Sequence, residues 1–141
     1  MNKRKIFVDS DVVLSSLISS KGAAYFLLNE TQLDLFISNI SLEELRRGLE
    51  KLQLNKKDFA TLIENKMNLV KLKDLDKVKL EFRDYVFDAD DAHIVAGARK
   101  AKVILVLSYN IKDFNILKLK EDLKIVVKTP AQFLQYLRSL Q

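Results

Sequence analysis

A carboxylate follows a short apolar run at residues 7–11 (FVDSD), and this junction constrains the fold more than any other segment. Residues 5–8 are typical of a buried strand, and the apolar spacing over residues 10–19 predicts the helix that follows. Asp9 would then lie at the carboxyl edge of a parallel sheet, where open α/β folds bind their ligands. The junction therefore predicts an α/β fold with a polar site at one sheet edge.

Apolar runs of strand length alternate with amphipathic helical stretches, which predicts a parallel sheet with crossover helices. Strands are expected over residues 6–8, 33–37, 69–72, 103–107 and 123–127. Helices are expected over residues 10–19, 23–29, from Ser38 or Ser41 to about residue 52, 55–65, 76–85, 91–101 and from Pro130 onward. The most apolar of the strands, 103–107, is expected at the centre of the sheet.

The chain of 141 residues has the length of one domain, so a single domain over residues 1–141 is expected. It contains no Cys and one His, which excludes disulfides, thiolate zinc sites and Cys nucleophiles and argues against a His relay. The N-terminus shows no signal peptide, and the longest apolar runs, about six residues, are too short to cross a bilayer. We therefore expect a soluble, cytoplasmic protein without membrane contact.

Lys and Arg outnumber Asp and Glu by 24 to 19, which gives a net charge of +5. Composition alone favours a solvated, lysine-rich surface. The same excess would also attract a polyanion to a basic body whose acids gather in a cleft. Composition does not distinguish these two arrangements.

Two further acidic points fall at places comparable to that of Asp9. Glu44 lies one turn inside the helix after the second expected strand, and Asp91 opens an Ala-rich helix at the end of the acidic turn 88–91 (DADD). Carboxylates are the ligands of hard divalent cations, and the near absence of His and Cys leaves no softer donor set. Their convergence at one sheet edge would form a site for a hard divalent cation.

Each acid also has a structural alternative. Asp9 could cap the following helix, although its neighbours could do so equally well. Glu44 could serve as the capping-box partner of Ser41, and Glu43 is an alternative to it that points further toward solvent. The acidic turn 88–91 could be an exposed helix cap.

A polar segment follows the fourth expected strand. Ser108, Asn110 and Asp113 offer oxygen donors at the same sheet edge, and Lys112 offers a cation for phosphate. The alternative is a polar turn that Phe114 anchors to the core.

Other polar residues remain open between two roles. His93 is interpreted as a partly buried structural side chain rather than a general base. Arg46 and Arg47 could contact phosphates or remain solvated, and Tyr109 could stack on a base or pack against the protein.

Four segments, taken together and in order, resemble the motifs of PIN domains. The segments are 7–14 (FVDSDVVL), 37–45 (ISNISLEEL), 90–96 (DDAHIVA) and 107–114 (LSYNIKDF). The alignment of the first three selects Asp9, Glu44 and Asp91. Two positions depart from the family pattern, because Asp11 stands where Asn is usual and Asn110 stands where many members have a fourth Asp.

The resemblance implies a three-layer α/β/α sandwich with a parallel sheet of four or five strands, and Mg²⁺- or Mn²⁺-dependent cleavage of RNA. The implied site residues are the metal ligands Asp9, Glu44 and Asp91, the further catalytic residue Asp113, and the substrate- or water-positioning residues Ser108 and Asn110. Size and layout are similar to VapC-type toxins of toxin–antitoxin pairs, which implies a homodimer and a small antitoxin protein. The Asn110 departure keeps a second interpretation open, a PIN-like module that binds RNA or protein without cutting it.

Overall fold

The computed structural model describes residues 3–29 and 32–141. Within these ranges, five strands form one parallel sheet in the order β3-β2-β1-β4-β5. The strands are β1 (Arg4–Val8), β2 (Leu33–Ser38), β3 (Met67–Val70), β4 (Leu105–Leu107) and β5 (Val126–Lys128). The helices are α1 (Ser10–Ile18), α2 (Ala23–Asn29), α3 (Asn39–Leu52), α4 (Lys56–Lys66), α5 (Leu75–Phe82), α6 (Ala92–Ala101), α7 (Ile116–Lys118) and α8 (Pro130–Ser139). The short 3₁₀ and π turns are η1 (Arg83–Tyr85), η2 (Ala89–Asp91), η3 (Ile111–Asp113) and η4 (Leu119–Leu123).

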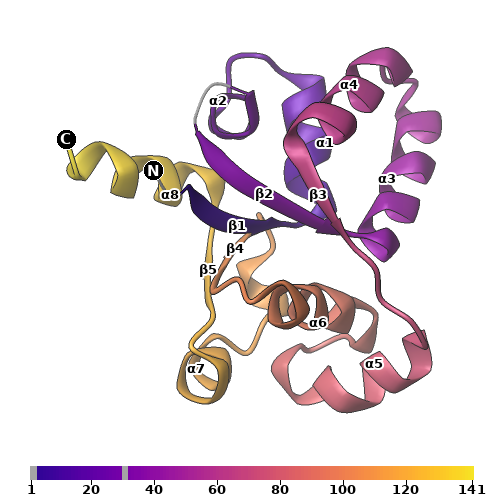
Figure 1. Ribbon diagram of the computed structural model, residues 1–141, viewed down its shortest axis with the longest axis vertical. Coiled ribbons are helices and arrows are strands. Elements are labelled where there is room, and N and C mark those ends of the chain that lie inside the picture. Colours follow the sequence, from indigo (N-terminus) through magenta and orange to yellow (C-terminus); the bar gives the residue numbers. More distant parts are fainter. Residues whose placement is uncertain (1–2, 30–31) are drawn as a thin grey trace.

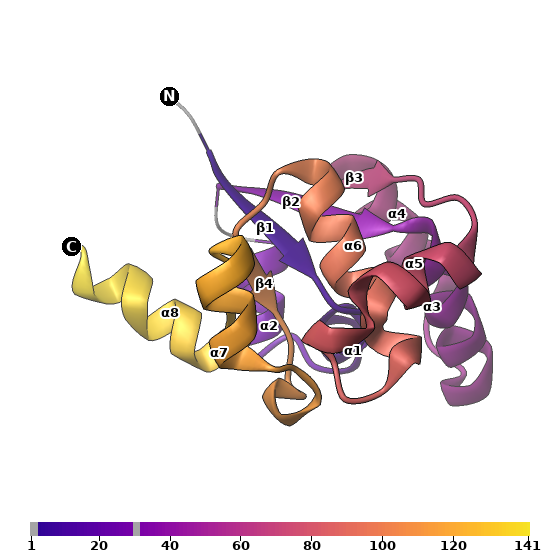
Figure 2. The same cartoon turned by 90° about the horizontal axis from the view of Figure 1, so that it is seen from below.

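Helices cover both faces of the sheet and give the molecule three layers (Figure 1). Helices α1 to α4 lie over one face, α5 to α7 lie over the other, and α8 extends outward from the body (Figures 1 and 2). The predicted α/β/α sandwich with a parallel sheet is therefore confirmed.

The side chains of β1 divide between two hydrophobic cores. Ile6 and Val8 join the core beneath α1 to α4, which also contains Phe133 of α8. Phe7 points to the opposite face and joins the core beneath α5 and α6. Burial on both faces explains why this strand reads as a continuous apolar run rather than an alternating one.

Helix α6 packs unusually close to β1 because its inward residues are small. Residues 92–98 of this helix are all buried. A Cβ atom placed on Gly97 would lie only 2.5 Å from Cζ of Phe7, so the aromatic ring occupies the space that a side chain would need. The Ala- and Gly-rich composition of α6 therefore sets the spacing between this helix and the central strand.

Each strand differs from its expected range by one to three residues at one or both ends, and β4 begins at Leu105 rather than at residue 103. Strand β3 begins at Met67, directly after α4 ends, rather than at residue 69. Strand β5 begins at Val126 rather than at residue 123, because η4 occupies the preceding residues and closes at Lys124 with a positive φ of 60°. A left-handed residue at that point prevents an earlier start of the strand.

The prediction that residues 103–107 form the centre of the sheet is wrong. Strand β1 is central, because it pairs with β2 on one side and with β4 on the other. Val106 and Leu107 of β4 are buried because β4 is also an inner strand. Apolar character identifies inner strands but does not rank them.

No single helix in the described ranges is long and apolar enough to cross a membrane. The bent pair of α1 and α2 meets the test only by length and composition, with an angle of 100° between the helices.

The contact between Gly97 and Phe7 predicts a large effect of a small substitution. We expect Gly97→Ala to destabilise the fold by about 1–3 kcal/mol despite the better helix propensity of Ala, because the buried ring must shift to admit the methyl group. Urea unfolding followed by circular dichroism measures this loss. Gly22→Ala is the matched control, because no atom lies within 4 Å of its added Cβ. Unchanged or greater stability of Gly97→Ala would contradict the close packing.

Candidate active site

The polar site lies at the point where the order in which the chain adds strands to the sheet reverses. From β1 the chain adds β2 and β3 on one side, and β4 and β5 join on the other. In such sheets the crevice outside the carboxyl ends of the strands at this switch point is the usual binding site. Asp9 follows β1 and Ser108 follows β4, so both residues lie at this point. Figure 2 shows β1 pointing toward the start of α1, with α6 alongside.

Asp9 is buried and both of its carboxylate oxygens accept hydrogen bonds. The residue is only 8% exposed to solvent. Oδ1 accepts from the Ser10 N–H at 2.7 Å, which caps α1, and Oδ2 accepts from the Ser108 hydroxyl at 2.8 Å. The capping role and a position at the sheet edge are therefore compatible. Each oxygen also keeps a lone pair for a further ligand.

The segment after β4 binds the segment after β1 through several hydrogen bonds. The backbone N–H of Asn110 donates to the Ser108 hydroxyl at 3.1 Å. The carboxylate of Asp11 accepts at one oxygen, Oδ2, from the Tyr109 N–H at 3.1 Å and from the Asn110 side-chain amide at 3.0 Å. The Tyr109 hydroxyl lies 3.0 Å from the hydroxyl of Ser15 on α1. These contacts place Ser108 and Asn110 beside the two acids of the first motif.

A second set of backbone contacts brings Asp113 toward the acidic turn 88–91. Val86 and Phe114 form an antiparallel bridge, and the N–H of Phe87 donates to the carbonyl of Asp113 at 3.0 Å. The segment that leads into the acidic turn is therefore fastened to the turn that carries Asp113. This tether joins residues far apart in the sequence.

The three acids of this turn have different roles. Asp88 accepts a hydrogen bond from the Asp90 N–H at 2.9 Å and so caps η2. Asp90 forms a surface ion pair with Lys79 at 2.9 Å, with its side chain 77% exposed. Asp91 makes no capping hydrogen bond although it stands at the start of α6. Asp91 is therefore the acid of the turn whose carboxylate is left for the site.

Glu44 approaches the site from α3, next to a buried histidine. Ser38, one of the two candidate caps, caps α3 by accepting from the Ser41 N–H at 3.0 Å, so the alternative capping box between Ser41 and Glu44 does not form. Oε1 of Glu44 lies 3.3 Å from Nε2 of His93. The other ring nitrogen, Nδ1, lies 3.5 Å from the Ser38 hydroxyl. His93 is 2% exposed, and so more deeply buried than expected.

Asp11 and His93 are the residues that the sequence reasoning left out of the site. The signal for Asp11 was its place two residues after Asp9, on a family position where Asn is usual. The signal for His93 was that it is the only titratable residue within the apolar run that follows Asp91. Neither signal identified a contact, because the partners lie on other elements.

Burial and mutual repulsion raise the pKa of three carboxyl groups of the site, those of Asp9, Asp11 and Asp91. Burial raises the pKa of Asp9 to about 7, and the neighbouring charge of Asp11 adds to the effect. Burial likewise raises the pKa of Asp11 to about 6 and that of Asp91 to about 6. The charge of Asp113 raises the pKa of both Asp11 and Asp91 further. Several acids thus act on one another at one edge of the sheet, and Glu44 adds to the field at Asp9.

The oxygen donors of the site fit a hard divalent cation by their chemistry. Among the described side chains, the buried oxygens that accept no hydrogen bond are Oδ1 of Asp11 and Oε1 of Glu44, although Nε2 of His93 lies 3.3 Å from the latter. Carboxylate oxygens are the preferred ligands of Mg²⁺ and Mn²⁺. Within residues 3–29 and 32–141, no three acidic or His side chains already stand as a complete ligand set. Shared binding of one ion by Asp9, Glu44 and Asp91 would therefore require their side chains to shift.

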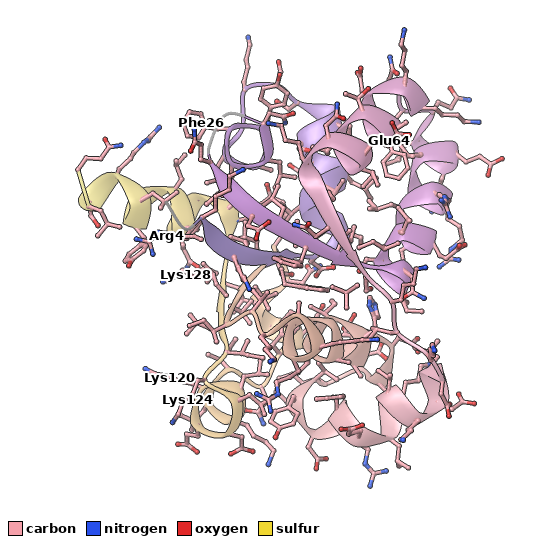
Figure 3. The ribbon with its side chains drawn as sticks, in the orientation of Figure 1. Arg4, Phe26, Glu64, Lys120, Lys124 and Lys128 are labelled. Carbon is pink, nitrogen blue, oxygen red and sulfur yellow. The ribbon has the colours of Figure 1, made fainter. Side chains whose placement is uncertain are left out.

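A cavity of about 530 Å³ lies at the opposite, amino edge of the sheet. It is lined by cations and apolar side chains, among them Arg4, Lys128 and Tyr136. The guanidinium of Arg4 lies 5.6 Å from the centre of the Tyr136 ring. Figure 3 shows Arg4 and Lys128 near the base of α8. No acidic residue is among the described residues that line this cavity, so its chemistry differs from that of the carboxylate site.

The raised pKa values predict that the metal-free fold loses stability with rising pH. A carboxyl group whose pKa is higher in the folded state contributes stability that is present below its unfolded value, 3.8, and lost through its folded value, about 7 for Asp9. In EDTA, we expect Asp9→Asn to exceed the wild type in unfolding free energy at pH 8 by about 2 kcal/mol or more, and the gap to close near pH 4. Urea unfolding at pH 4, 6 and 8 measures it. Asp90→Asn should keep the wild-type profile over this range, and a flat difference for Asp9→Asn would contradict the prediction.

Solved structures with the same fold come from toxin–antitoxin systems. A toxin–antitoxin complex from Klebsiella pneumoniae contains a chain that is 21% identical, with a TM-score of 0.64 over 89% of this chain and 97% of that one. VapBC2 from Rickettsia felis, bound to a promoter DNA fragment, is 14% identical with a TM-score of 0.61, over 89% and 98%. Mycobacterium tuberculosis VapC20, a sarcin–ricin loop cleaving toxin, is 19% identical with a TM-score of 0.54, over 72% and 86%. These likenesses show the fold.

No curated protein matches the chain significantly. The PIN domain family matches residues 5–112, a span that includes the ends of β1, β2 and β4 and the start of α6. This span holds Asp9, Glu44 and Asp91 and covers more than half of the sequence. The chain belongs to the PIN domain family.

Proposed function

We propose that this protein is a metal-dependent ribonuclease that hydrolyses RNA phosphodiester bonds at the carboxylate site, and that it is the toxin of a toxin–antitoxin pair. The observation that carries the proposal is the gathering of mutually repelling carboxylates at the switch point, where Asp11 and Glu44 each have a buried oxygen that accepts no hydrogen bond. A divalent cation would offset both the repulsion and the missing partners. Membership of the PIN domain family supports the same interpretation.

Asp9, Glu44 and Asp91 would hold the ion. When bound, Mg²⁺ or Mn²⁺ would lower the pKa of a coordinated water and offset charge on the attacked phosphate. Asp9 enters this role with its orientation fixed by the Ser10 N–H and the Ser108 hydroxyl. Glu44 would take this role with Nε2 of His93 lying 3.3 Å from its Oε1 atom.

The remaining polar residues would orient water and RNA. The carboxylate of Asp113 and the side chain of Asn110 would accept hydrogen bonds from the attacking water at the edge of the site. Lys112 is exposed on the same turn, η3, where its ammonium group can approach a phosphate. Tyr109 is 42% exposed and offers a ring for base stacking. The net charge of +5 would favour approach of the polyanion.

The likeness to toxin–antitoxin complexes supports a small antitoxin protein as partner. We further propose that the protein forms a homodimer, that residues 1–141 form a single PIN-like domain, and that it is located in the cytoplasm. The similar toxin from Mycobacterium tuberculosis cleaves the sarcin–ricin loop, which favours RNA as the substrate class.

A PIN-like module that binds RNA or protein without cutting it is the second candidate. It is favoured by one observation, that no complete ligand set stands ready among the described side chains. Cleavage that depends on a divalent cation separates the two candidates, because a binding module would retain RNA in Mn²⁺ and in EDTA alike without shortening it.

We expect the purified protein to cleave RNA in Mn²⁺ or Mg²⁺ and to stop in EDTA. Asp91→Asn should lower the cleavage rate by roughly 100-fold or more, because it weakens the hold on the cation that would stabilise the charge of the transition state. Asp90→Asn is the matched control, since Asp90 is next to Asp91 but its own carboxylate is exposed and paired with Lys79. Its rate should stay within about threefold of the wild type.

Gel analysis of an end-labelled RNA measures these rates, and the two variants purified in parallel report any contaminating nuclease. Cleavage that persists in EDTA, or equal rates for Asp91→Asn and the wild type, would remove the proposed mechanism.

A further inference from the structure

Only one of the two oxygens of the Asp11 carboxylate accepts hydrogen bonds. Its Oδ2 atom accepts two hydrogen bonds, from the Tyr109 N–H and from the side-chain amide of Asn110. Its Oδ1 atom is buried and accepts none. The N–H of Val12 lowers the pKa of Asp11, but it donates its hydrogen bond to the backbone carbonyl of Asp9, at 3.1 Å, and not to Oδ1. One oxygen is thus fully engaged and the other is without a partner.

The charged groups that act on the Asp11 carboxylate are of the wrong kind to supply that partner. The acids whose charges act on Asp11 are Asp113 and Asp91, and Asp11 in turn acts on Asp9. Ionised carboxylates accept hydrogen bonds and do not donate them. A buried acceptor without a donor costs stability, which native proteins usually avoid by means of water or an ion. Among negative neighbours, a cation fits this position best.

The two departures from the PIN pattern meet in one hydrogen bond. Asp11 carries a carboxylate where Asn is usual, and Asn110 carries an amide where Asp is frequent. The structure joins these two side chains at 3.0 Å across 99 positions of sequence. The pair therefore still contains one carboxylate and one amide, with the charge on the α1 side instead of the β4 side. The Asn at position 110 is an exchange within the pair, and no charge is lost.

We propose that Asp11 is a fourth carboxylate of the divalent-cation site, acting through Oδ1, and that Asn110 and Tyr109 orient it. This inference rests on the proposed function, because it adds a residue to the same site. It assigns to Asp11 the role that the resemblance would have given to an acid at position 110. Asn110 is then a positioning residue rather than a sign of lost activity.

Metal affinity tests the inference without any measurement of catalysis. Calorimetric titration with Mn²⁺ should show Asp11→Asn binding at least about tenfold more weakly than the wild type. The double exchange Asp11→Asn with Asn110→Asp moves the carboxylate back across the same hydrogen bond. It should recover affinity to within about threefold of the wild type. The control is Asp90→Asn, whose acid faces Lys79, and its affinity should be unchanged.

Circular dichroism in EDTA checks that each variant is folded. Asp11→Asn removes a like charge from the cluster and should not lose stability. Should it fail to fold, Asn110→Ala keeps the carboxylate while removing one orienting donor, and its Mn²⁺ affinity should fall by about threefold to tenfold.

The outcomes separate this inference from the proposed function. Unchanged affinity in Asp11→Asn, or in Asn110→Ala if that variant is needed, overturns the role of Asp11. A double exchange no better than Asp11→Asn alone overturns the pairing argument. If Asp9→Asn still weakens Mn²⁺ binding in either case, the proposed metal site stands without Asp11. A wild type that binds no Mn²⁺ overturns both.

Discussion

Repulsion among carboxylates at the end of the central strand is the constraint that the rest of the structure accommodates. Asp9 is held in a dehydrated position by a backbone N–H and a hydroxyl, each of which favours its charge, while burial and its neighbours oppose that charge. A similar balance recurs at Asp11, where backbone N–H groups favour the charge, and burial and neighbouring acids also raise the pKa of Asp91. A fold maintains such an arrangement only where surrounding contacts fix it independently. Here those contacts are the two hydrophobic cores on either side of β1 and the loop after β4.

The loop after β4 does more than carry polar side chains. Through Ser108 and Asn110 it holds the first motif, and through the bridge between Val86 and Phe114 its continuation holds the acidic turn. Two distant parts of the chain are thereby tied to one short connection. The order of the site depends on backbone pairing as much as on the acids themselves.

The sequence predicted the fold class and the positions of Asp9 and Asp91 at element ends, because apolar periodicity and strand-end rules are local. It did not predict that Asp11 pairs with Asn110, since that contact spans 99 positions and depends on β1 and β4 being neighbours. It placed the wrong strand at the centre for a related reason, as strand order is a property of pairing. The roles of Glu44, Asp113, Ser108 and Asn110 in catalysis stay predictions.

The close approach of Gly97 to Phe7 has a consequence for the chemistry as well as for packing. Phe7 stands two positions before Asp9, and Gly97 stands six positions after Asp91, so one van der Waals contact couples the strand end to the helix start. The size of residue 97 therefore influences the distance between the first motif, which follows β1, and the third motif, which begins α6. A larger residue at position 97 would push α6 away from β1, and with it Asp91 away from Asp9, without contacting either acid.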